Sequence, residues 1–76
     1  MNKQELQQTL DNENVPCDLY NLNGGLPNEA FCLNKNQNTW EVYYSERGLR
    51  TQIKRFRSEE EACDYFYKTV LENCKY

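Results

Sequence analysis

Residues 40–71 read WEVYYSERGLRTQIKRFRSEEEACDYFYKTVL, and this stretch decides the fold. Apolar and polar residues alternate over residues 40–45 and again over residues 49–54, which is the period of a half-buried strand. Between the two segments, Gly48 can adopt the positive φ that a hairpin loop often needs. We therefore predict two neighbouring antiparallel strands joined by a loop over residues 45–48.

A helix is expected to follow over residues 59–74. Ser58 and Glu61 have the spacing of a capping box, in which each side chain accepts a hydrogen bond from a backbone N–H of the first turn. Apolar residues recur along one face of this helix, namely Cys63, Phe66, Tyr67, Val70 and Cys74. Phe56 breaks the alternation of the preceding strand, so we expect that strand to bulge or end near Arg55.

The upstream half supplies a short helix and two more strands. Residues 2–12 contain good helix formers, and Leu6 and Leu10 lie one turn apart, so we expect these leucines to dock the helix. The two strands are expected at residues 17–22 and 29–33. The Asn23-Gly24-Gly25 turn separates them, and a polar loop over residues 34–38 follows.

These elements define a single α+β domain over residues 1–76. Short connections favour a four-stranded antiparallel meander sheet, with the C-terminal helix packed on one face and a short N-terminal helix. The residues that we expect to be buried together are Trp40, Val42, Ile53, Phe66 and Val70.

Charge is unevenly distributed along the chain, whose net charge is −3. Residues 1–46 carry −5, residues 47–57 carry +5 with no acid, and residues 58–76 carry −3. A basic strand therefore lies between two acidic segments. The overall acidity argues against bulk nucleic-acid binding and favours basic partners.

The residue types in this sequence give little support for catalysis or for metal binding. The sequence has no His, so no Ser–His or Cys–His pair can form, and no Gly-rich phosphate loop occurs. No apolar run has the length of a signal peptide or membrane span, so we expect a cytoplasmic protein that does not bind membranes. We expect no enzyme activity, no cofactor and no metal, and four free thiols at Cys17, Cys32, Cys63 and Cys74.

The basic strand, Arg50 to Arg57, leaves several alternatives open. Arg50 and Lys54 are expected on the outer face of the sheet with Tyr43, where they could form ion pairs with Glu41. The same face could contact a protein, or it could bind single-stranded nucleic acid by stacking and charge.

Two sequence blocks resemble small bacterial immunity proteins of polymorphic-toxin systems. The first is W-E-V-Y-Y-S-E-R-G over residues 40–48, and the second is F-x-S-E-x-E-A-C-x-Y-F over residues 56–66. The pieces Tyr20-x-Leu22 and A-F-C-L over residues 30–33 resemble the same family, and contact-dependent-inhibition immunity proteins are a neighbouring possibility. The resemblance implies a cytosolic antidote that binds one cognate toxin domain and blocks it, with no catalytic residues to carry over.

The expected partner is a cognate toxin protein, such as a basic nuclease domain, bound by a monomer or weak dimer. We predict a partner-binding set of residues that lie outside the core. They are placed there by the strand alternation, by the hairpin tip or by the first turn of the helix: Glu41, Tyr43, Glu46, Arg47, Glu59 and Glu60. Their acids could pair with Lys or Arg that a nuclease uses on phosphate. The alternative function is a small nucleic-acid-binding or regulatory module that uses the basic strand.

Overall fold

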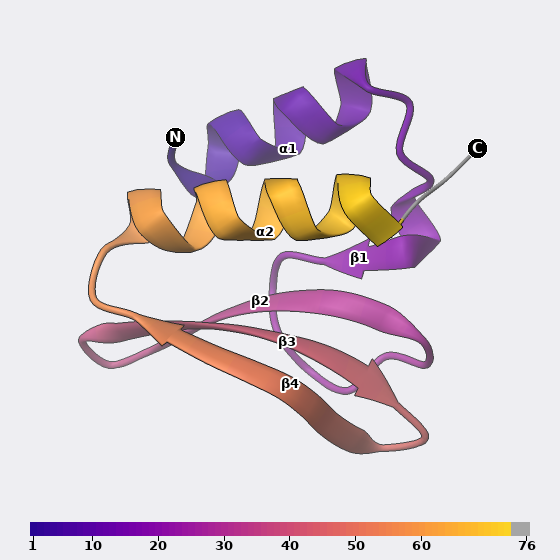
Figure 1. Ribbon diagram of the computed structural model, residues 1–76, viewed down its shortest axis with the longest axis vertical. Coiled ribbons are helices and arrows are strands. Elements are labelled where there is room, and N and C mark those ends of the chain that lie inside the picture. Colours follow the sequence, from indigo (N-terminus) through magenta and orange to yellow (C-terminus); the bar gives the residue numbers. More distant parts are fainter. Residues whose placement is uncertain (74–76) are drawn as a thin grey trace.

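The structure, a computed structural model, describes residues 1–73 and places two helices on one side of a four-stranded sheet (Figure 1). The helices are α1 (Lys3–Asn12) and α2 (Glu59–Asn73), and a 3-10 turn, η1 (Cys17–Leu19), follows α1. The strands, which lie in the sheet in chain order, are β1 (Tyr20–Asn21), β2 (Ala30–Asn36), β3 (Thr39–Glu46) and β4 (Leu49–Phe56). The predicted α+β fold with four strands and a helix at each end is confirmed.

The sheet is mixed, which corrects the predicted antiparallel meander. β1 pairs with β2 in parallel, whereas β2 with β3 and β3 with β4 are antiparallel. Residues 22–29 do not form a hairpin: they carry the chain past the sheet and back, so that β2 runs in the same direction as β1 (Figure 1). Parallel strands normally need a crossover of about a dozen residues or more. Eight suffice here because β1 is only two residues long.

Both antiparallel hairpins are tighter than the sequence predicted. β2 continues to Asn36, so only residues 37–38 remain of the expected polar loop. β3 continues to Glu46, which leaves Arg47 and Gly48 as a two-residue turn with φ of 52° and 77°. Positive φ at both central residues is the type I′ geometry, whose twist matches that of the flanking strands.

Side-chain caps begin both helices. Asn2 and Glu5 form a complete capping box on α1: the Asn2 Oδ1 accepts from the Glu5 N–H at 2.8 Å, and the Asn2 N–H donates to the Glu5 carboxylate at 3.0 Å. Before α2, the Ser58 Oγ accepts from the Glu61 N–H at 3.1 Å, as predicted. The Glu61 carboxylate accepts from the Ser58 hydroxyl at 3.2 Å, whereas the predicted capping box has it accept from the Ser58 backbone N–H.

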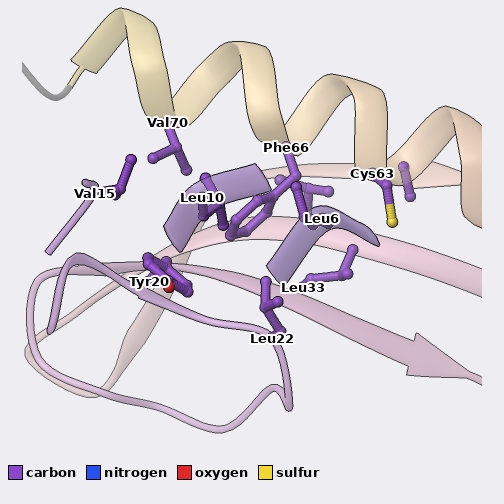
Figure 2. Packing of buried hydrophobic residues seen from close by; sticks show 11 residues of the cluster. Leu6, Leu10, Val15, Tyr20, Leu22, Leu33, Cys63, Phe66 and Val70 are labelled. Carbon is purple, nitrogen blue, oxygen red and sulfur yellow. The ribbon is translucent and has the colours of Figure 1, made fainter. Parts of the chain in front are cut away.

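The main core lies between the helices and the sheet (Figure 2). Phe66 and Val70 of α2 are fully buried against Leu6 and Leu10 of α1, which confirms the predicted docking of the first helix. Val42 of β3 is buried as predicted, but Trp40 is only half-buried at the edge of this cluster. The predicted burial of Ile53 is wrong, since 40% of that residue is exposed.

A bulge in β4 explains why Ile53 is exposed. Val42 lies opposite Lys54 and Tyr44 lies opposite Thr51, so the single residue between them on β3 faces two residues on β4, Gln52 and Ile53. The extra residue changes which side of the sheet each later side chain occupies. The expected irregularity therefore exists, but it lies before Arg55, and the strand continues to Phe56. Phe56 packs on Tyr65 of α2 with ring centroids 5.3 Å apart.

Candidate protein-binding surface

β4 forms an exposed edge of the sheet. It pairs only with β3, and each of its residues from Leu49 to Arg55 is exposed. Leu49 and Ile53 are apolar residues with 66% and 40% of their surface exposed. An edge strand carries backbone N–H and C=O groups that no neighbouring strand satisfies. β4 therefore combines free hydrogen-bonding groups with apolar and basic side chains.

Glu41 does not lie at the surface, which corrects its expected place in a contact set. Only 5% of the residue is exposed, and it lies on the side of the sheet turned away from the helices, which we call the far face. Its carboxylate is 3.2 Å from the Arg55 Nε and 4.0 Å from the Arg50 Nη1, and it accepts from the Asn34 Nδ2 at 3.4 Å. The predicted pairing with Arg50 is present, but the bulge puts Arg55 where Lys54 was expected.

Tyr43 is buried on the far face beside Glu41, and 1% of it is exposed. Its hydroxyl donates to the Gly25 carbonyl oxygen at 2.6 Å, and the Arg50 guanidinium lies 4.8 Å from its ring centroid. Burial, followed by the nearby Cys32 thiol, raises the pKa of Tyr43. Alternation correctly indicated the side of the sheet, but neither Tyr43 nor Glu41 is available to a partner in this structure.

The connection over residues 22–29 covers this part of the far face. Besides the Gly25 contact, Gly24 lies so close to β2 that a Cβ there would be 2.6 Å from the Asn34 Oδ1. Ala30, Cys32 and Ser45 form a second, smaller buried layer on the same face, since Cys32 is in register with Tyr43 and Ala30 with Ser45. The Ser45 hydroxyl in this layer has no hydrogen-bond partner within the described part of the chain.

The other four predicted contact residues lie at the two ends of β4. Glu46 and Arg47 are at the hairpin turn that precedes β4, and Glu59 and Glu60 begin α2 just after it. Eight strand residues at about 3.3 Å each put the two pairs roughly 25 Å apart. Glu60 is exposed, whereas the Glu59 carboxylate accepts a hydrogen bond from the Lys3 N–H at 2.8 Å. These residues flank the edge strand and do not form one compact patch.

Charge separates the two layers of the molecule. Residues 1–19 and α2 together carry nine acids and two lysines, whereas residues 20–58 carry six basic residues and three acids. The helical side is therefore acidic and the sheet side is basic. Because Arg50 and Arg55 share the Glu41 carboxylate, Arg47, Lys54 and Arg57 are the cations of the basic segment without an ion-pair partner in residues 1–73.

A pocket that the sequence did not predict lies on the helical side of the sheet, next to β4. Its volume is about 270 Å³, and its walls come from η1, the end of the connection before β2, the sheet and the end of α2: Leu19, Glu29, Phe31, Tyr44, Gln52 and Asn73. The Phe31 and Tyr44 rings pack with centroids 4.9 Å apart. Burial, followed by the Glu29 and Glu46 carboxylates, raises the pKa of Tyr44. These residues come from separate parts of the sequence, so no local pattern predicts that they meet. Glu29 and Gln52 both have positive φ, but neither residue type favours that conformation, so the sequence gives no sign of it.

The described cysteines are unpaired, and residue 74 lies outside the described residues. Cys17 is an exposed free thiol, and Cys32 and Cys63 are buried free thiols. Burial, followed by the Glu59 carboxylate, raises the pKa of Cys63 to about 11, and burial also raises the pKa of Cys32. Within residues 1–73, no three acidic or cysteine side chains gather as metal ligands would.

Neither α1 nor the described part of α2 has the length and apolarity needed to cross a membrane. Comparisons with protein-family models, with curated proteins and with solved structures found no match to this chain.

Proposed function

We propose that this chain is a protein-binding protein that inhibits its partner: an immunity protein that neutralises a bacterial toxin domain in the cytoplasm. The observation that carries the proposal is the exposed edge strand, in which seven consecutive residues are accessible and two of them are large and apolar. Adding a partner strand to such an edge is a common mode of protein recognition. The resemblance of residues 40–48 and 56–66 to immunity proteins supplies the kind of partner.

The proposed contact surface runs along β4 from the hairpin turn to the start of α2. It keeps four residues of the predicted set, Glu46, Arg47, Glu59 and Glu60, as its two ends, and it replaces Glu41 and Tyr43 by Leu49 and Ile53. A standard interface buries roughly 800 Å² on each partner, which a surface about 25 Å long can supply. A toxin seated there would be blocked sterically.

Electrostatics would orient the partner. The strand carries a basic side chain, Lys54, between acidic residues that lie beyond both of its ends. Complementary charges on a toxin would therefore alternate along the contact, and such patterns favour one partner and one register over others. The chain would act as a monomer or weak dimer, because contact between two copies would bring the same basic strands together.

The test is neutralisation of the protein encoded by the neighbouring reading frame. That protein should stop growth when expressed alone in a bacterial host, and co-expression of this chain should restore growth. Leu49→Asp and Ile53→Asp should abolish the rescue because they place charge in the proposed contact. The matched control is Leu26→Asp, since Leu26 is also apolar and 53% exposed but belongs to the connection over residues 22–29. Circular dichroism should confirm that all three variants fold.

The possible outcomes distinguish the proposed function from the proposed contact surface. If the wild-type chain protects against no neighbouring toxin, the immunity proposal is wrong. If the wild type protects and both β4 variants protect equally well, the function stands and the proposed surface is wrong.

One observation favours nucleic-acid binding as a second candidate, namely the five basic residues of residues 47–57. Two other observations weigh against it: Arg50 and Arg55 contact Glu41, and Tyr43 is buried and cannot stack on a base. Fluorescence anisotropy with a single-stranded RNA at physiological salt tests this candidate. Tight binding that Lys54→Glu and Arg57→Glu together abolish would favour it over the immunity proposal.

A further inference from the structure

The pocket beside β4 is open to solvent on the same side of the molecule as part of the proposed contact surface. Gln52 belongs to both, since it lies in the exposed edge strand and lines the pocket. At about 270 Å³ the pocket is smaller than the roughly 300–1,000 Å³ of typical small-molecule sites. It has room for about one long side chain.

The lining has the chemistry of a cation site. The Phe31 and Tyr44 rings supply an aromatic wall, and aromatic faces attract ammonium and guanidinium groups. Glu29 supplies a carboxylate that pairs with no cation within residues 1–73, and the lining contains no basic residue. Burial together with the neighbouring Glu29 and Glu46 carboxylates raises the pKa of Tyr44, which is consistent with a negative local potential.

Two amide side chains complete the lining. The Asn73 Nδ2 donates to the Thr69 carbonyl oxygen at 2.8 Å, which leaves the Asn73 Oδ1 as an acceptor. The Gln52 side chain makes no hydrogen bond within the described residues, so its carbonyl oxygen is a second acceptor. A guanidinium group carries five N–H donors, which suits several acceptors around one small space.

The backbone around the pocket is held in an uncommon conformation. Glu29 has φ of 54° and Gln52 has φ of 55°, although neither is glycine. Non-glycine residues in this region are uncommon and gather at ligand and active sites. Two of them line this pocket, Gln52 in the bulge of β4 and Glu29 directly before β2.

We propose that this pocket receives one Arg or Lys side chain of the protein partner, with the cation between the Glu29 carboxylate and the Tyr44 ring. The inference rests on the proposed function, whose partner it describes further. A toxin nuclease uses such side chains to hold phosphate, so their capture would remove part of the machinery that the toxin needs.

The first experiment uses the isolated chain and needs no toxin. Butylguanidinium, which mimics an Arg side chain, is titrated while amide NMR spectra are recorded, and butylurea serves as its neutral isostere. Butylguanidinium should cause saturable shifts at the Gln52 and Asn73 side-chain amides, and butylurea should bind at least about fivefold more weakly. Equal binding of the two compounds, or shifts that do not saturate, would overturn the proposal.

Variants test the assigned carboxylate. Glu29→Gln should weaken butylguanidinium at least about fivefold. The matched control Asp11→Asn removes the same charge and should leave the affinity unchanged, because Asp11 is an exposed acid of α1 outside the lining. If Glu29→Gln disturbs the spectrum as a whole, Gln52→Glu provides a second readout, since an added carboxylate should strengthen binding. An unchanged affinity in that variant would count against the proposal.

The source of the cation is tested with the neutralised toxin. Glu29→Gln should weaken binding to the toxin by a similar factor. If Glu29→Gln loses butylguanidinium but keeps full affinity for the toxin, the pocket is a site for free cations and the proposed partner contact is wrong. Neutralisation by the wild-type chain would be unaffected by that result, so failure of this inference is distinguishable from failure of the proposed function.

Discussion

Substitution of two adjacent glycines can test whether the connection over residues 22–29 is seated on the far face of the sheet. Gly24 and Gly25 both have positive φ, 75° and 87°, so alanine is strained at either position. They differ in their surroundings. A Cβ on Gly24 would lie 2.6 Å from the Oδ1 and 3.0 Å from the Cγ of Asn34, whereas a Cβ on Gly25 has no neighbour within 4 Å.

The two variants should therefore differ in their free energy of unfolding. In each variant, the left-handed conformation of alanine lowers the free energy of unfolding by about 1–2 kcal/mol. The less flexible unfolded chain raises it by about 0.4–1 kcal/mol. Gly24→Ala also forces Asn34 away, and overpacking of this kind costs about 1–3 kcal/mol. We expect Gly24→Ala to be less stable than Gly25→Ala by about 1–3 kcal/mol in urea denaturation. Each kcal/mol corresponds to about 4–8 °C in melting temperature for a domain of this size.

A double-mutant cycle identifies the cause. In an Asn34→Ala background the extra penalty of Gly24→Ala should shrink, because the atoms nearest to the new methyl group are gone. Equal stabilities of the two glycine variants would refute the close approach of the connection to β2. An extra penalty that persists without the Asn34 side chain would refute its attribution to that contact.

The remaining predictions also concern the free energy of unfolding. Phe66→Ala should lower it by about 3–5 kcal/mol because the ring is fully buried, and a loss below about 1 kcal/mol would contradict the core assignment. Ser58→Ala should lower it by about 0.5–2 kcal/mol through loss of the helix cap, and an unchanged denaturation midpoint would count against that cap. Ser45→Ala should be neutral or stabilising by up to about 1 kcal/mol, because a buried hydroxyl without a partner is removed; a clear loss would mean that the hydroxyl is satisfied in solution. The pKa of Cys63 rises from 9.0 to about 11 on folding, so the unfolded chain ionises first and the thiol's contribution to stability is lost as pH rises through that range. Relative to Cys63→Ala, the wild-type protein should lose about 2 kcal/mol between pH 9 and 11, and parallel pH curves for the two proteins would exclude this linkage.

Local sequence patterns predicted the helices and strands well, but they predicted less well how these elements are connected and what covers them. The alternation around Val42 and the Ser58 cap are properties of neighbouring residues, and the structure confirms both. The direction of β1 could not be obtained in this way. The Asn23-Gly24-Gly25 signal marks a change of direction, but it does not say whether the next strand returns beside the first or crosses over.

Burial of the far face illustrates a second limit. Alternation assigned Glu41 and Tyr43 to the side opposite the helices, but it says nothing about what covers that side. A usable signal was present in β2, where A-F-C-L is apolar on both faces, because a strand buried on both faces loses its alternation. The break at Phe56 indicated a bulge, but not that the extra residue lies at Gln52 or Ile53. That difference exposes Ile53 and brings Gln52 to the pocket.

The order in which the elements follow one another has a consequence for biosynthesis. β2, β3, β4 and α2 are consecutive both in the chain and in the fold, whereas Leu6 and Leu10 of α1 are buried against Phe66 and Val70. Synthesis proceeds from the N-terminus at about 5–20 residues per second, so about 3–12 s separate the making of α1 from that of its partner. During that interval the apolar stripe of α1 has no α2 to cover it, and so short a helix is marginal by itself. The first helix of the chain therefore cannot complete its packing until α2, the last described element, has been made.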